Sequence, residues 1–366
     1  MAGAYESSKR IFYFDVLRAL AILFVILSHV CKTFAGNFPI GTNKWLFAAG
    51  FADIAVMGVP VFLMISGALL LGRDYTLKDF MKRRFSRILI PFIFWALLLP
   101  ICKMVFLGEA WTLSNYIKLF FLDQYWFIWM LIGAYLLLPI MNSFIKEFEL
   151  DGLAYLLIIW FVTMILFREF SFGIIEKLFE VHPMGWKEIF AGYFGFFPLG
   201  YYLSIKKFKL SDKQMCIIGL ILLIVFTAIN LAHTFIDGPK NNALSYYGYR
   251  RIVSTVQCIG LFLFIQYFSK YCEENSGTFK NKVYSFFKDT AISKLILSIS
   301  ICSYGMYLTH YFWLYPLRYV SHNIFPIFSQ NPVLIPVVLA FIALMSWILV
   351  LIFSKIPILK YFSGAH

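Results

Sequence analysis

The stretch RALAILFVILSH, residues 18–29, decides the fold class, because it sets an arginine and a histidine at the two ends of an apolar run. Ten residues separate Arg18 from His29, and nine of them are apolar. The surrounding run, residues 11–31, is long enough to cross a bilayer, since a spanning helix needs about 20 apolar residues. Ionisable groups at membrane depth are costly and usually face protein or a wet cavity, so this stretch predicts a membrane helix with a polar face.

The composition extends this prediction to the whole chain. Of its 366 residues 61% are hydrophobic and only 14% are charged, whereas a soluble domain carries about 25% charged residues. We therefore expect an all-α, polytopic membrane protein, and the absence of an internal repeat or linker predicts a single domain over residues 1–366. Ten apolar stretches are long enough to span, some only with tilt or a break: 11–31, 45–71, 88–107, 125–145, 152–168, 188–205, 214–236, 249–269, 292–316 and 332–354.

The basic residues predict an orientation rather than a nucleic-acid partner. The net charge of +13 is spread over short runs between apolar stretches, where a positive-inside bias appears. With both termini in the cytoplasm, 20 Lys and Arg residues lie inside and 11 outside, which favours that orientation. The six cysteines form no C-x-x-C pair and fall mostly in apolar runs, so neither a disulfide framework nor a metal site is expected.

Helical geometry puts three ionisable residues of the first stretch in line. Eleven residues at 100° each bring His29 back onto the face of Arg18, about 16 Å further along the axis. Asp15 lies three residues before Arg18, within reach of an ion pair. Two interpretations remain open from the residues: a structural Asp15–Arg18 pair with an interfacial His29, or a row of reactive groups.

Two later stretches carry further polar groups. In KRRFSRILIPFIFW, residues 82–95, Arg84 and Arg87 share one helix face; they either belong to a positive-inside cluster or bind phosphate oxygens. In SYGMYLTH, residues 303–310, His310 lies inside an apolar helix, where a neighbouring carbonyl or hydroxyl commonly satisfies it.

Taken in order, these stretches resemble the acyltransferase-3 family of integral membrane proteins. RALAILFVILSH fits its Arg-x10-His motif, and KRRFSRILIPFIFW fits its Arg-x-x-Arg motif followed by proline. PVFLMISGALLL (60–71), WFIWMLIGAYLLLPI (126–140) and SYGMYLTH fit three further signatures. Pro60 stands where many members carry aspartate, which resembles the short subgroup typified by the enterobacterial common antigen O-acetyltransferase and the staphylococcal intercellular-adhesion membrane protein.

The resemblance implies acyl transfer from cytoplasmic acyl-CoA, most simply acetyl-CoA, to a hydroxyl of a surface glycan or lipid-linked saccharide. It implies a multi-pass protein of a bacterial inner membrane, with no tightly bound cofactor and no nucleic-acid partner. His29 would be either a general base or a transient acyl carrier, with Arg18 more suited to positioning the donor. The expected site residues are His29, Arg18 and Asp15 for catalysis, Arg84, Arg87, Ser66 and Trp126 for the donor, and His310 and Tyr307 for the acceptor.

Two other classes of protein fit parts of the pattern. A bundle with midplane charges and broken helices could be a transporter of a lipid-linked sugar or small solute, although no inverted repeat is evident. A non-catalytic membrane module that tethers a partner would not need ionisable groups in lipid.

Overall fold

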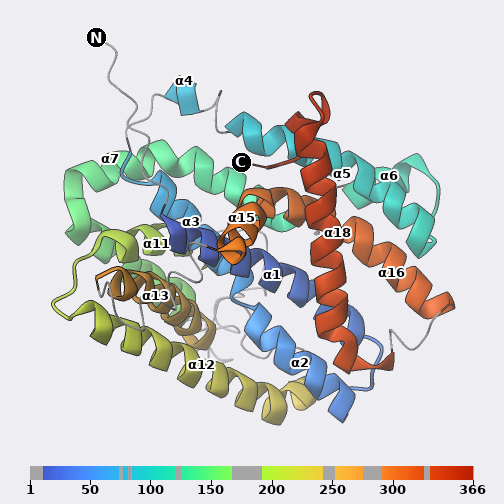
Figure 1. Cartoon of the computed structure of the whole chain (residues 1–366), viewed down its shortest axis with the longest axis horizontal. Helices are drawn as coiled ribbons and strands as arrows, with labels where there is room; N and C mark the ends of the chain where they lie inside the picture. Colours follow the sequence, from blue (N-terminus) through green and yellow to red (C-terminus); the bar gives the residue numbers. More distant parts are fainter. Residues whose placement is uncertain are drawn as a thin grey trace, which may run out of the picture.

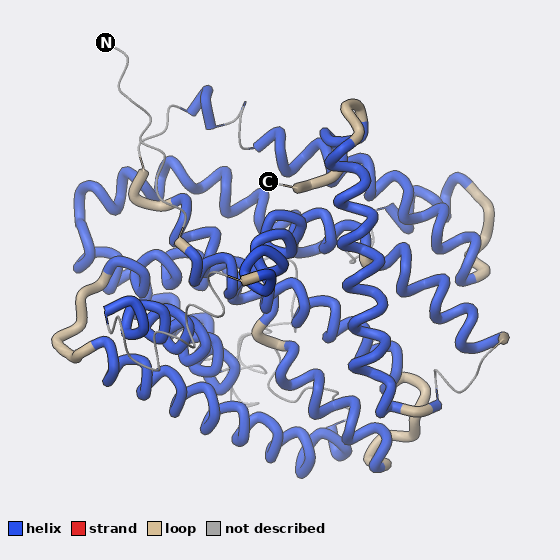
Figure 2. Tube along the Cα trace, in the orientation of Figure 1, coloured by secondary structure: helices blue, strands red, loops and turns tan. Residues whose placement is uncertain are grey.

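A computed structural model describes residues 11–73, 77–80, 82, 85–120, 125–166, 192–241, 252–274, 290–324 and 330–365. Within these ranges every regular element is helical, as Figure 2 shows. The elements are α1 Phe12–Ala35, α2 Asn43–Ala55, α3 Gly58–Leu70, α4 Leu77–Phe80, α5 Ser86–Leu107, α6 Leu113–Phe120, α7 Trp126–Trp160, a π-helical turn Phe161–Leu166, α11 Phe196–Ile205, α12 Asp212–Asn241, α13 Ile252–Glu274, α15 Ala291–Thr309, α16 Tyr311–Asn323, α18 Ile335–Lys355, and 3-10 turns Pro332–Leu334 and Leu359–Phe362.

Eight helical segments among the described residues are long and apolar enough to cross a membrane. The expectation of an all-α polytopic membrane protein is therefore confirmed. One segment, Trp126–Thr163, covers two of the predicted stretches, 125–145 and 152–168. Its 38 residues would reach about 57 Å, well beyond a bilayer core of about 30 Å. The backbone accordingly breaks at Glu149, where φ is 51° and ψ is −144°.

Three further predicted spans differ in detail from the observed helices. The stretch 45–71 is divided between α2, which ends at Ala55, and α3, which begins at Gly58. The stretch 188–205 is described only from residue 192 onward, so its status as a span stays a prediction. The stretch 292–316 is not one helix, because α15 ends at Thr309 and α16 starts at Tyr311, with His310 in the turn between them. Neither proline nor glycine marks the break in the sequence, and the apolar run continues across it, so the hydropathy pattern does not reveal it.

Helix α1, which carries Asp15, Arg18 and His29, lies in the middle of the bundle (Figure 1). It packs against α2, α3, α13, α15 and α18. By contrast, only 22% of the α12 span is buried, and this helix forms one side of the bundle with α13 (Figure 1). The α1 span is 67% buried, so its ionisable residues lie in a well-shielded helix, as the cost of charge in a bilayer requires.

Candidate active site

One cavity of about 270 Å³ lies between α1, α3, α5, α7 and α15. Four sequence-predicted site residues line it: Arg18, Ser66, Arg87 and Tyr307. The remaining lining includes Tyr135 together with Ser300, Ser303 and Tyr304, so hydroxyl groups accompany the two guanidinium groups. Arg18 is half-buried and Arg87 is exposed, so positive charge runs from the surface into the bundle. Such a cavity suits an anionic ligand with a long polar arm.

Asp15, Arg18 and His29 of α1 all face α15 or the residues that follow it. Asp15 is 4% exposed, and its Oδ1 accepts a hydrogen bond of 2.7 Å from the Ser300 hydroxyl. Arg18 lines the cavity next to the same stretch of α15, and His29 contacts Tyr311, the first residue of α16. The single face follows from α1 being one unbroken helix of 24 residues.

Replacing Ser300 with alanine should destabilise the protein, because it removes a donor from the buried carboxylate of Asp15. We expect a loss of about 1–3 kcal/mol in unfolding free energy, measured as a lower thermal midpoint in detergent. Ser303→Ala is the matched control, since the Ser303 hydroxyl donates to the Ser300 carbonyl within the same helix. Equal midpoints for the two variants would contradict the assigned role of Ser300.

Two histidines stack on each other near Tyr307, and neither is among the residues that line the cavity. The rings of His29 and His310 stack with centroids 5.1 Å apart and planes inclined by 27°. The hydroxyl of Tyr311 lies 2.9 Å from Nδ1 and 3.2 Å from Nε2 of His29. Sequence reasoning selected both histidines but missed Tyr311, although it directly follows His310 in the chain.

His310 is held by its own helix end. It is 0% exposed, and its Nδ1 lies 2.6 Å from the carbonyl oxygen of Tyr307. Its Nε2 is buried and has no hydrogen-bond partner among the described residues. The break between α15 and α16 therefore turns one imidazole nitrogen to the backbone and leaves the other open.

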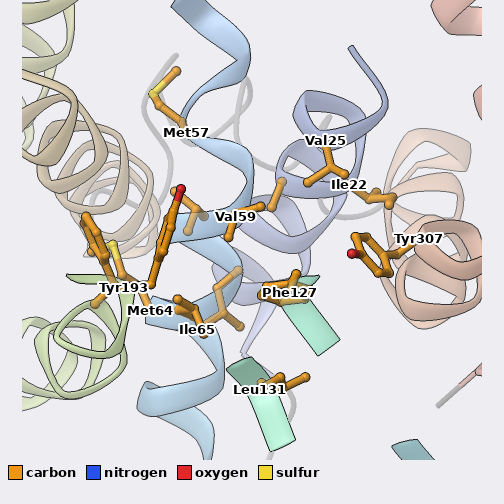
Figure 3. Close-up of a cluster of buried hydrophobic side chains, with 14 of the residues drawn as sticks. Ile22, Val25, Met57, Val59, Met64, Ile65, Phe127, Leu131, Tyr193 and Tyr307 are labelled. Carbon is orange, nitrogen blue, oxygen red and sulfur yellow. The ribbon is translucent and has the colours of Figure 1, made fainter. Parts of the chain in front are cut away.

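Three aromatic residues of the cavity wall form a row of ring contacts that ends at His310. The Phe127 ring lies 6.1 Å from Phe62 and 5.3 Å from Tyr307, and the Tyr307 ring is 5.8 Å from that of His310. Figure 3 shows Tyr307 directed from α15 toward Phe127 and toward Ile22 of α1. We name Phe62, Phe127 and Tyr307 the aromatic row. Tyr307 thus belongs to the cavity wall and also contacts the ring of His310.

The other residues expected to bind the donor have different outcomes. Trp126 is not among the residues that line the cavity; its ring packs 5.0 Å from Tyr193, ahead of α11. Arg84 lies outside the described residues. Ser66 does line the cavity, with its hydroxyl bonded to the Phe62 carbonyl at 2.8 Å. Within the described ranges no three His, Cys, Asp or Glu side chains gather as a metal site would require.

Fold and site together define a polytopic membrane protein with a basic cavity and an interior histidine pair. The sequence pattern of the family described as an acyltransferase domain, acyltransferase-3, matches residues 11–353. The chain belongs to this family.

Two curated relatives match part of the chain. Nodulation protein NolL of Mesorhizobium japonicum is 24% identical over 193 residues, which are 50% of this chain and 50% of that protein. Nodulation protein NolL of Sinorhizobium fredii is 27% identical over 150 residues, or 39% of each chain. The matched part thus spans half or less of the length of these relatives. No solved structure matches the chain.

Proposed function

We propose that the protein transfers an acyl group, in the first place acetyl, from cytoplasmic acyl-CoA to a hydroxyl of a surface glycan or lipid-linked saccharide. The proposal places it in a bacterial inner membrane with both termini in the cytoplasm. One observation carries it: a single cavity has two arginines in its wall and, next to Tyr307 of that wall, a stacked pair of imidazoles.

The cavity matches the chemistry of a coenzyme A thioester. The phosphates of CoA are too polar to cross a bilayer, while its reactive sulfur sits at the end of a long pantetheine arm. Arg18 and Arg87 offer planar donors for phosphate oxygens. Serine and tyrosine hydroxyls in the same wall suit the amides of the arm.

The spacing along α1 separates binding from chemistry. Arg18 and His29 are about 16 Å apart along the helix axis, too far for both to contact one carbonyl group. In this proposal Arg18 positions the donor and His29 acts at the thioester, after the arm has passed the aromatic row. Asp15, bonded to Ser300, holds the middle of α15 next to Arg18.

The test uses detergent-purified protein and acetyl-CoA labelled in the acetyl group. The wild type should bind the label and transfer it to envelope carbohydrate in membrane vesicles. Arg87→Gln should weaken acetyl-CoA binding about tenfold or more, because a hydrogen bond to a charged group contributes about 1.5–3 kcal/mol.

Arg73→Gln is the matched control, since Arg73 is exposed and is not among the residues that line the cavity. Equal weakening in both variants would point to general surface charge and contradict a phosphate site at Arg87. A wild type that binds no acyl-CoA at all would overturn the proposed function.

A further inference from the structure

The two histidines differ in which nitrogen atoms are occupied. A backbone carbonyl only accepts hydrogen bonds, so the contact of 2.6 Å between His310 Nδ1 and the Tyr307 carbonyl places the hydrogen on Nδ1. A neutral imidazole with hydrogen on Nδ1 has a lone pair on Nε2. That nitrogen is buried and has no hydrogen-bond partner among the described residues.

A buried nitrogen with an open lone pair is rare in folded proteins, and each case calls for an explanation. Here the atom lies at the proposed reaction centre, because the His310 ring stacks on His29 at 5.1 Å. His29 differs from His310 in its hydrogen bonding, because the hydroxyl of Tyr311 lies within 3.2 Å of both of its ring nitrogens. Of the two histidines, His310 therefore has a ring nitrogen, Nε2, whose lone pair can accept a proton.

The arrangement also contains the third group that a general base needs. In catalytic triads an acceptor behind the imidazole fixes its tautomer and stabilises its protonated form. For His310 this acceptor is the carbonyl oxygen of Tyr307, which contacts Nδ1. A carbonyl does the task without adding a second buried charge inside a membrane protein. Because the ring of Tyr307 also lines the cavity, the same residue links the donor arm to the base.

We propose that His310 is the general base of the transfer, an assignment that rests on the proposed function. Nε2 takes the proton of the acceptor hydroxyl while the hydroxyl oxygen bonds to the thioester carbonyl carbon. The carbon–sulfur bond then breaks, and the CoA sulfur leaves with the proton from Nε2 as a free thiol. His29, with Tyr311 against it, holds the thioester carbonyl during these steps.

The variant His310→Asn separates this role from a structural one. The asparagine Nδ2 can still donate to the Tyr307 carbonyl, but the side chain has no basic nitrogen in place of Nε2. We expect acetyl-CoA binding to stay within about twofold of wild type. The rate of acetyl transfer to envelope carbohydrate should fall by about 10²–10⁴, the contribution typical of a general base.

A second variant and a control complete the experiment. In His310→Ala, added imidazole should restore part of the lost transfer, which a structural defect would not allow. His233→Asn is the matched control, because His233 lies half-exposed on α12 with Asp237 as its partner. The control should transfer acetyl at the wild-type rate.

The outcomes distinguish the two proposals. If the wild type transfers acetyl and His310→Asn stays within threefold of it, the base assignment fails while the proposed function stands. The assignment also fails if His310→Asn loses binding as strongly as transfer, because that identifies a packing role. If the wild type releases no CoA and transfers no acetyl, the proposed function itself is wrong.

Discussion

Replacing Gly200 with alanine is expected to prevent the protein from folding into its native bundle. Gly200 lies in α11 where that helix crosses α3, and a Cβ atom there would overlap the backbone carbonyl group of Met64. The same crossing holds Gly67 of α3 against the backbone of Phe197. Since the obstructing atoms belong to the main chain, no side-chain rotation relieves the overlap. The helices would have to separate.

The cost should reach or exceed the upper end of the range for overpacked cores, about 1–3 kcal/mol. Close helix approach through small residues is a main source of stability in membrane bundles, and here it would be lost. Separation would also displace Phe62 and Ser66, which line the cavity from α3. We therefore expect little monodisperse protein after detergent extraction, measured by size-exclusion chromatography.

Gly50→Ala is the matched control for this prediction. A Cβ at Gly50 in α2 would lie 3.6 Å from the side chains of Leu231 and Phe235, an ordinary contact distance. That variant should yield protein with the elution profile and thermal midpoint of wild type. If Gly200→Ala behaves as Gly50→Ala does, the α3–α11 crossing is looser than described.

Hydropathy and helical spacing were enough to predict the membrane helices and the shared face of α1. Runs of about 20 apolar residues correspond to helices because lipid leaves the backbone no other hydrogen-bond partners. The shared face of Asp15, Arg18 and His29 could be calculated because α1 is continuous and regular. Arg18 and Arg87 could be grouped with Ser66 by the family motifs, and all three line one cavity.

Contacts between distant parts of the chain could not be obtained in this way. His29 and Tyr311 are 282 residues apart, and no periodicity connects them. The turn at His310 interrupts an apolar run without proline or glycine at its centre, so hydropathy predicted one helix where there are two. Trp126 belongs to a site motif, yet its ring packs on Tyr193, because the facing direction of a side chain depends on how the helix is placed.

Replacing His29 with alanine should nearly abolish acetyl transfer while leaving donor binding intact. His29 does not line the cavity that holds Arg18 and Arg87, so acetyl-CoA should bind within about twofold of wild type. Transfer should fall by about 10²–10⁴, as expected when a side chain that acts at the reacting group is removed. The measurement is labelled acetyl incorporation at saturating donor.

Two further variants test whether the effect of His29→Ala comes from the histidine itself. Tyr311→Phe removes only the hydroxyl that contacts His29, so a loss of about tenfold is expected, in line with one hydrogen bond. Ser28→Ala is the matched control, since the Ser28 hydroxyl bonds the Val25 carbonyl within α1 and should not affect transfer. Full transfer by His29→Ala would exclude any role for this residue in the reaction.

The double variant His29→Ala with His310→Asn tests whether the histidines act together. Residues that serve one step are strongly non-additive, so removing the second one should cost little once the first is gone. We expect the double variant to transfer acetyl about as slowly as the slower single variant. Losses that multiply would instead assign the histidines to separate steps. An acetyl group retained on the wild type without acceptor, and absent from His29→Ala, would then make His29 the acyl carrier and leave His310 to activate the acceptor hydroxyl.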